Sequence, residues 1–151
     1  MNRYFKEVLD THVLIQDWLG DANAHADICD KLLLRFSLTF SMVTPGGVLL
    51  DFAALKAFFS TQRGARQGLN IEIIDMQVIA ENERGATVTY KEIQQLPGRK
   101  QRAVFQLLCL KRGMTDMQSG GIFTKPLCLK IRQQCRELLE VTWHLVSKVR
   151  L

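Results

Sequence analysis

Hydrophobic positions in the first 35 residues recur at the spacing of an α-helix. A helix over Asn2–Leu19 gathers its apolar residues on one face, and Gly20 supplies a stop. A second helix is predicted over Asp27–Arg35, because Asp27 and Asp30 place carboxylates in its first turn, where the helix dipole favours them. The apolar positions of the first helix are Tyr4, Val8, Leu14, Ile15 and Trp18.

The hydrophobic period then changes from near 3.6 to two. Residues alternate over Phe40–Thr44, Pro45–Gly47 forms a tight turn, and Val48–Leu50 returns as the paired strand. Asp51 follows at once and is predicted to cap a helix over Phe52–Gln62.

Two long alternating segments come next, and they predict long strands over Leu69–Glu81 and Ala86–Gln95. The alternation changes phase at Ile73-Ile74, which predicts a β-bulge. Turns are predicted at Glu83–Gly85 and Leu96–Arg99. The order of elements predicts an α+β fold, in which a strongly curved, cone-like antiparallel sheet and N-terminal helices surround a pocket.

The balance of charge changes near Lys100. Up to that residue the chain holds 11 Lys and Arg against 12 Asp and Glu, and from Gln101 to Leu151 it holds 9 against 3. The two net charges, −1 and +6, give the +5 of the 151-residue chain, and three of its four cysteines follow the change. We therefore treat residues 1–100 as one domain and residues 101–151 as an atypical basic tail.

Several classes of protein are disfavoured by the composition. The N-terminus carries charges throughout and no apolar run is long enough to span a membrane, so we expect a cytoplasmic protein without a membrane partner. The cysteines show no CxxC spacing and no metal-like pairing with the three histidines, so a metal site is not expected. We expect no cofactor either. The basic residues of the tail are scattered and lack interleaved aromatics, which argues against nucleic-acid binding.

The segments RFSLTFSMVTPGGVLLDFAALKAFF and GARQGLNIEIIDMQVIAENERGATVTYKEIQ resemble the nuclear transport factor 2-like superfamily, and within it the small SnoaL-like or ketosteroid-isomerase-like bacterial proteins. The resemblance covers residues 1–100 and rests on the strand–turn–strand–Asp–helix unit, which is a scaffold signature. It implies a homodimer with a small-molecule pocket in each subunit. Catalytic members of the superfamily place a general base and an oxyanion donor in that pocket.

The resemblance stops at about residue 101, where two further long strands would be expected and QRAVFQLLCLKRGMTDMQSGGIFTKPLCLKIRQQC stands instead. Codons read one nucleotide earlier permit RFSTALF from Ala103 onward and IWRHFHET at Gln118–Pro126, and both strings fit the superfamily. We therefore hypothesise that the tail is translated in a shifted frame. The consequence would be an unpaired sheet edge after the fourth strand.

The alternative interpretation takes the tail as native sequence. Ala103–Leu110 is then a strand, Gly113–Gly121 a loop and Lys130–Val149 an amphipathic helix.

Few side chains suggest chemistry. Tyr90 and Glu92 are the candidates for an acid–base pair, because strand alternation places both on one face with Val88. His12 and His25 lack partners at ligand spacing and are predicted to lie on the surface. The candidates for contacting a small hydrophobic ligand, or for packing in the core instead, are Trp18, Phe40, Met42, Phe58 and Phe59.

These observations lead us to expect a small-molecule-binding domain without an assigned activity. One alternative is a lyase or isomerase acting on a small hydrophobic carbonyl compound, which requires Tyr90, Glu92 or Glu72 to face the cavity. A second alternative is a non-enzymatic interaction module whose basic tail binds an acidic partner.

Overall fold

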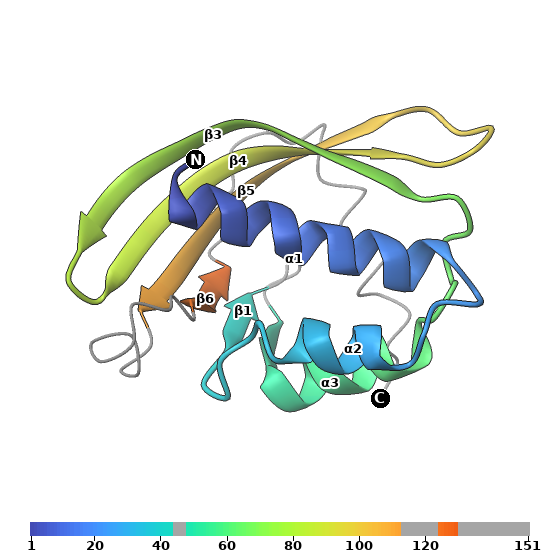
Figure 1. Cartoon of the computed structure of the whole chain (residues 1–151), viewed down its shortest axis with the longest axis horizontal. Helices are drawn as coiled ribbons and strands as arrows, with labels where there is room; N and C mark the ends of the chain where they lie inside the picture. Colours follow the sequence, from blue (N-terminus) through green and yellow to red (C-terminus); the bar gives the residue numbers. More distant parts are fainter. Residues whose placement is uncertain (44–47, 113–123, 130–151) are drawn as a thin grey trace.

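The computed structural model describes residues 1–43, 48–112 and 124–129, and it has an α+β architecture. Six strands form one sheet in the order β2-β1-β6-β5-β4-β3. The longest helix, α1, lies lengthwise against the long strands β3, β4 and β5, and α2 and α3 lie on the opposite side of α1 (Figure 1). Helix α1 thus covers one face of the curved part of the sheet.

The three helices begin and end close to where the sequence predicts them. They span Arg3–Gly20 (α1), Asp27–Leu33 (α2) and Phe52–Thr61 (α3). Asn2 caps α1, since its side chain accepts the Tyr4 backbone N–H. Asp51 caps α3 as predicted, because its Oδ1 accepts the Ala54 N–H at 2.9 Å.

The two short strands before α3 are β1 (Ser41–Val43) and β2 (Leu49–Asp51), and they pair antiparallel. The predicted turn at Pro45–Gly47 lies outside the described residues. The long strands β3 (Asn70–Asn82) and β4 (Gly85–Gln95) also pair antiparallel. Their register shifts between Ile74 and Gln77, so the predicted bulge exists but lies slightly later, at Asp75, whose φ is 55°.

The sheet continues past Lys100, which corrects the expectation of an unpaired edge after the fourth strand. Strand β5 (Arg102–Arg112) pairs with β4 from Arg102 to Lys111, and β6 (Thr124–Leu129) pairs with β5. Alternation in β5 buries Val104, Leu108 and Leu110, so the tail supplies a strand with one buried face. The sheet is also not purely antiparallel, because β1 pairs with β6 in parallel.

Other predictions for the tail fall outside the described residues. These are the loop at Gly113–Gly121, the helix at Lys130–Val149 and most of the stretch that permits IWRHFHET in the shifted frame. The division of the chain at residue 100 and the shifted frame therefore stay predictions.

Two clusters of buried side chains form the core. The first joins Tyr4 and Val8 of α1 to Val88, Tyr90 and Leu108 of the sheet. The second lies at the other end of α1, where Trp18 and Leu19 meet residues of α2, α3 and the start of β3. Because α1 contributes to both clusters, it fixes the long strands relative to the shorter helices. Within the described ranges no helix has the length and hydropathy that a membrane span requires.

Candidate functional site

The end of α1 fixes the loop that connects α3 to β3. The last carbonyls of a helix lack partners inside the helix. Here the backbone N–H groups of Gly64, Arg66 and Gly68 donate to three such carbonyls at 2.8–3.0 Å, and those acceptors are Trp18, Leu19 and Gly20. Every second residue of the loop therefore donates a backbone hydrogen bond to the end of the helix. These hydrogen bonds fix the conformation of the loop.

Two glycines bring this loop close to its neighbours. At Gly64 the φ of +62° favours glycine, and an added Cβ would lie 2.4 Å from the Ala22 Cα. At Gly68 the φ is +73°, and an added Cβ would lie 2.7 Å from the Pro97 ring. The loop after α3 is thus packed directly against the turn between β4 and β5.

A cleft of about 510 Å³ lies between the loop after α3 and the β4–β5 turn. That volume falls within the range of small-molecule sites. Amide and cationic side chains make up most of its lining residues, and three apolar residues complete it. The lining residues are Gln62, Ala65, Arg66, Gln67, Gln94, Leu96, Pro97, Arg99, Lys100 and Arg102.

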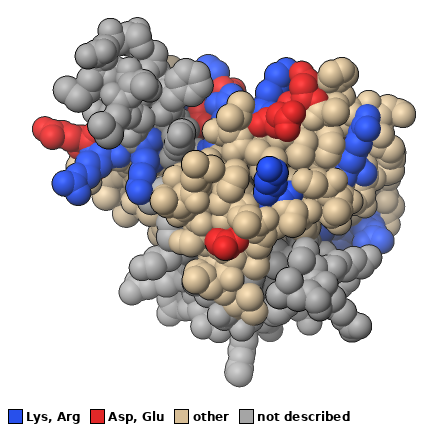
Figure 2. Space-filling view, turned by 90° about the horizontal axis from the view of Figure 1, so that it is seen from below, with Lys and Arg blue, Asp and Glu red and all other residues tan. Residues whose placement is uncertain are grey.

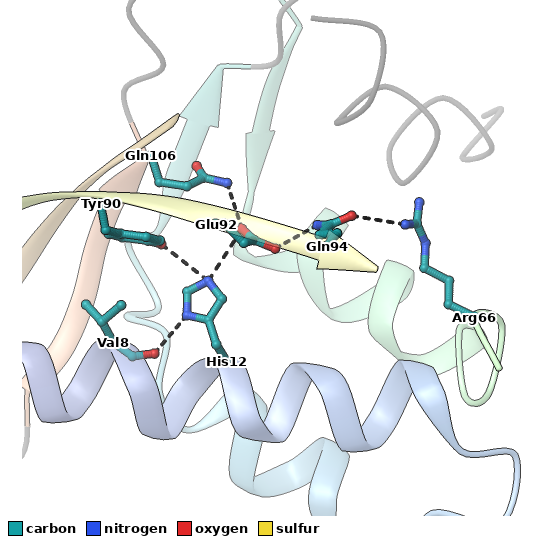
Figure 3. A network of polar contacts seen from close by, with 7 residues as sticks. All are labelled: Val8, His12, Arg66, Tyr90, Glu92, Gln94 and Gln106. Atoms are coloured by element: carbon teal, nitrogen blue, oxygen red, sulfur yellow. Dashed lines mark hydrogen bonds and ion pairs between the residues drawn. The ribbon is translucent and has the colours of Figure 1, made fainter. Parts of the chain in front are cut away.

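One wall of the cleft is connected to a buried polar network (Figure 3). Arg66 donates from Nη1 to Gln94 Oε1 at 3.3 Å, and Gln94 donates from Nε2 to Glu92 Oε1 at 2.7 Å. The Gln94 amide is therefore held from both ends in one orientation. A second amide, Gln106 of β5, donates to Glu92 Oε2 at 3.1 Å. The guanidinium at the cleft is thus positioned through side chains that are themselves fixed.

His12 completes the network from α1. Its Nδ1 lies 2.8 Å from the Val8 carbonyl oxygen, which can only accept, so Nδ1 carries a hydrogen. Its Nε2 faces Glu92 Oε2 at 3.6 Å and the Tyr90 hydroxyl at 3.4 Å. All three side chains are buried. The prediction of a surface His12 was therefore wrong, because its partners lie about 80 positions away in the chain; His25 is exposed as predicted.

The buried pair stabilises its own charges. Burial lowers the pKa of His12, but the hydrogen bonding and charge of the Glu92 carboxylate outweigh burial and raise it above 6.5. Burial raises the pKa of Glu92, but His12 and the two amides outweigh burial and lower it below 4.5. Burial holds the pKa of Tyr90 well above 10, and Glu92 adds to that effect, so its hydroxyl keeps its proton.

The cleft concentrates positive charge. Its lining includes four cationic side chains and no acidic one, and none of the four pairs with an acidic residue of the described part. On the described part of the face seen from below, basic and acidic side chains are interspersed among residues that are neither (Figure 2). The four cations are Arg66, Arg99, Lys100 and Arg102.

Comparison with solved structures identifies the fold family. An NTF-2-like protein of unknown function from Pseudomonas aeruginosa is 36% identical in sequence, with a TM-score of 0.71. The match covers 84% of this chain and 94% of that protein. The chain belongs to the NTF-2-like family.

A cystatin-like domain of unknown function from Nostoc punctiforme is 18% identical over 87% of this chain and 80% of that one. Its TM-score is 0.47. No protein-family model matches the chain, and a search of curated proteins found no match.

The residues predicted from sequence occupy two different places in this NTF-2-like fold. Tyr90 and Glu92 lie together on the buried face of β4, as the alternation predicted, but neither lines the cleft. Glu72 is exposed on β3. The apolar candidates are buried or partly buried, and none lines the cleft either. They are Trp18, Phe40, Met42, Phe58 and Phe59.

His12, Gln94 and Arg66 are among the contributors to the site that sequence reasoning missed. His12 follows Val8 by four positions and Tyr4 by eight, so its place on the buried stripe of α1 was a usable signal. Gln94 follows Glu92 by two and shares its face of the strand. Arg66 carried no signal, because only the packing of its loop against the β4–β5 turn brings it to Gln94. Among the described residues no cluster of side chains suited to a metal ion occurs.

Proposed function

We propose that this NTF-2-like chain is a small-molecule-binding domain whose site is the cleft between the loop after α3 and the β4–β5 turn. The observation that supports it is the wall formed by Gln94, a buried amide held between Arg66 and Glu92. A side chain fixed in this way presents a preorganised surface, which lowers the entropic cost of binding.

The character of the lining revises the expected ligand. The sequence suggested a small hydrophobic compound, whereas the cleft is lined mainly by amide and cationic side chains. Ala65, Leu96 and Pro97 supply an apolar part of the lining, which suits the carbon skeleton of a polar ligand. A polar small molecule therefore fits the cleft better than a hydrophobic one.

The test is to screen a mixture of uncharged, cationic and anionic fragments by ¹H–¹⁵N correlation spectra of the whole chain. Binding at the cleft should shift the amide signals of Arg66, Gln94 and Arg99. Filling the cleft by Ala65→Trp should abolish these shifts, whereas Ala57→Trp should not, since Ala57 is exposed on α3 and lies outside the lining. If no fragment shifted the amide signals of the cleft residues, or if the shifts persisted in Ala65→Trp, the result would argue against this site.

A second candidate, a lyase or isomerase acting on a small hydrophobic carbonyl compound, is favoured by the contacts among His12, Tyr90 and Glu92. These contacts supply an acid–base pair, but Gln94 separates it from the cleft. The geometry therefore supports binding more directly than catalysis. Turnover of carbonyl compounds that is lost in Glu92→Gln, while fragments still bind, would reverse this ranking.

Two further parts of the proposal rest on the resemblance and on the charge of the tail. We expect a homodimer. Sedimentation at micromolar concentration tests this, and a monomer would contradict it. Binding of an acidic partner by the tail is the remaining alternative. It predicts an affinity that falls steeply with salt and does not change in Ala65→Trp.

A further inference from the structure

The four cationic side chains of the cleft come from separate parts of the chain. Arg66 belongs to the loop after α3, Arg99 and Lys100 to the β4–β5 turn, and Arg102 to the start of β5. A run of charges on one element is usually a solvated face. Here the fold brings two distant segments together and places cations on both sides of a hollow.

Arg66 differs from a solvated surface arginine. Its side chain is half-buried, and its guanidinium donates to Gln94, whose exposed fraction is 9%. Burial lowers the pKa of Arg66, and the charges of Arg102 and Arg99 lower it further, while Glu92 opposes them. The cations therefore repel one another across the cleft, and no acidic side chain in the lining offsets that repulsion.

An anion in the cleft would remove this repulsion and satisfy the remaining donors. A guanidinium presents N–H groups in a planar fork that matches a carboxylate or phosphate group. The amides of Gln62, Gln67 and Gln94 add neutral hydrogen-bonding groups around it.

We propose that the cleft binds a small multiply charged anion, a phosphate ester or a di- or tricarboxylate, with Arg66 as the central contact. The anion proposal rests on the proposed binding function and names the class of ligand. Four cations in one cleft match an anion of more than one negative charge. The volume of about 510 Å³ admits a small organic anion rather than a polymer.

Isothermal titration calorimetry of the whole chain with inorganic phosphate and with citrate tests the proposal. Sodium chloride at matched ionic strength is the reference, because salt screens the charges of the cleft and because heats of non-specific ion binding must be subtracted. Saturable binding of at least one probe is expected. The probe with the higher affinity shows whether the cleft prefers a phosphate or a carboxylate group. Arg66→Gln should weaken that binding about tenfold or more, through loss of charge-assisted hydrogen bonds.

The matched control is Arg84→Gln, which makes the same change at an exposed position. Arg84 precedes β4, whereas Gln94 lies near its end, about 30 Å away along the strand. Arg84→Gln should bind as the wild type does. The double variant Arg99→Gln/Lys100→Gln provides a second test, since both residues are exposed on the turn and their replacement should leave the fold intact. It should weaken binding several-fold.

Two results would overturn the proposal: no saturable heat with either anion, or equal affinity in the wild type and in all the cleft variants. If uncharged fragments shift the cleft signals while neither anion binds, the anion assignment fails and the proposed binding function stands. If fragments and anions both leave the cleft unchanged, both proposals fail.

Discussion

Replacing Glu92 by glutamine should destabilise the fold in a manner that depends on pH. The Glu92 carboxylate accepts from Gln94 at 2.7 Å and from Gln106 at 3.1 Å, and it faces His12 at 3.6 Å. A glutamine amide keeps one acceptor oxygen and turns the other into a donor, so one of the two existing hydrogen bonds is lost. Gln106 recovers a contact only by turning its amide over, so that its Oε1, which has no partner in the described structure, accepts from the new donor.

The magnitude follows from these contacts. Loss of one hydrogen bond to a buried charged acceptor costs about 1.5–3 kcal/mol, and removing one member of a buried ion pair costs about 3–5 kcal/mol. Because glutamine keeps the shape and half of the acceptors, we expect a loss of roughly 2–4 kcal/mol in the free energy of unfolding. Glu72→Gln makes the same change on exposed β3 and should cost less than about 0.5 kcal/mol.

The dependence on pH identifies the mechanism. In the wild type the raised pKa of His12 contributes stability that is fully present below its ordinary pKa of 6.5 and is lost as pH rises through the raised value. In Glu92→Gln the two effects of Glu92 on the pKa of His12 are lost, and burial, which lowers that pKa, is opposed only by the hydrogen bond to the Val8 carbonyl. The part of the contribution that Glu92 supplies therefore disappears. Glu92 remains ionised across this window because its pKa is lowered below 4.5.

The assay is urea unfolding of wild type, Glu92→Gln and Glu72→Gln at about pH 5.5 and about pH 9, on either side of the window set by His12. The cost of Glu92→Gln should be larger at the lower pH, by about 1.4 kcal/mol for each unit by which Glu92 raises the pKa of His12. If Glu92→Gln lowered the free energy of unfolding no more than Glu72→Gln does, or lowered it equally at the two pH values, the charged contact between His12 and Glu92 would not stabilise the fold.

Three further predictions concern the scaffold and the tail. Asp51→Ala removes the cap of the Ala54 N–H and should lower the free energy of unfolding by about 1 kcal/mol in urea unfolding. Gly64→Ala forces a side chain into a φ of +62° against Ala22 and should cost more than about 1 kcal/mol, with broadened loop signals in NMR spectra. Sequencing of the coding DNA across residues 99–104 tests the shifted frame: an extra or missing base supports it, and a confirmed sequence makes the tail native.

The long elements of this fold were predictable because they follow from local periodicity. The stripe of α1, the cap at Asp51 and the alternation of β3 and β4 each depend on residues a few positions apart. The bulge was placed early because the phase change begins at Ile73, while the backbone accommodates it at Asp75.

The candidate site was less predictable because its contacts join distant segments. His12 meets Glu92 only when α1 packs across β4. Counting charge by segment assigned the basic excess to the tail, yet Arg66, Arg99 and Lys100 belong to the part with a net charge of −1. Their convergence depends on two loops packing at Gly68 and Pro97, which charge balance cannot reveal.

Anion binding at Arg66 can be followed through the NMR signals of the side chains that would contact the anion. Citrate or phosphate is titrated into ¹⁵N-labelled protein at constant ionic strength while the Arg66 Nε–H and Gln94 Nε–H signals are recorded. If the anion binds in the cleft, both signals should shift saturably while the Arg84 signal does not move. Signals that do not move, or that drift linearly in parallel with Arg84, would contradict binding in the cleft.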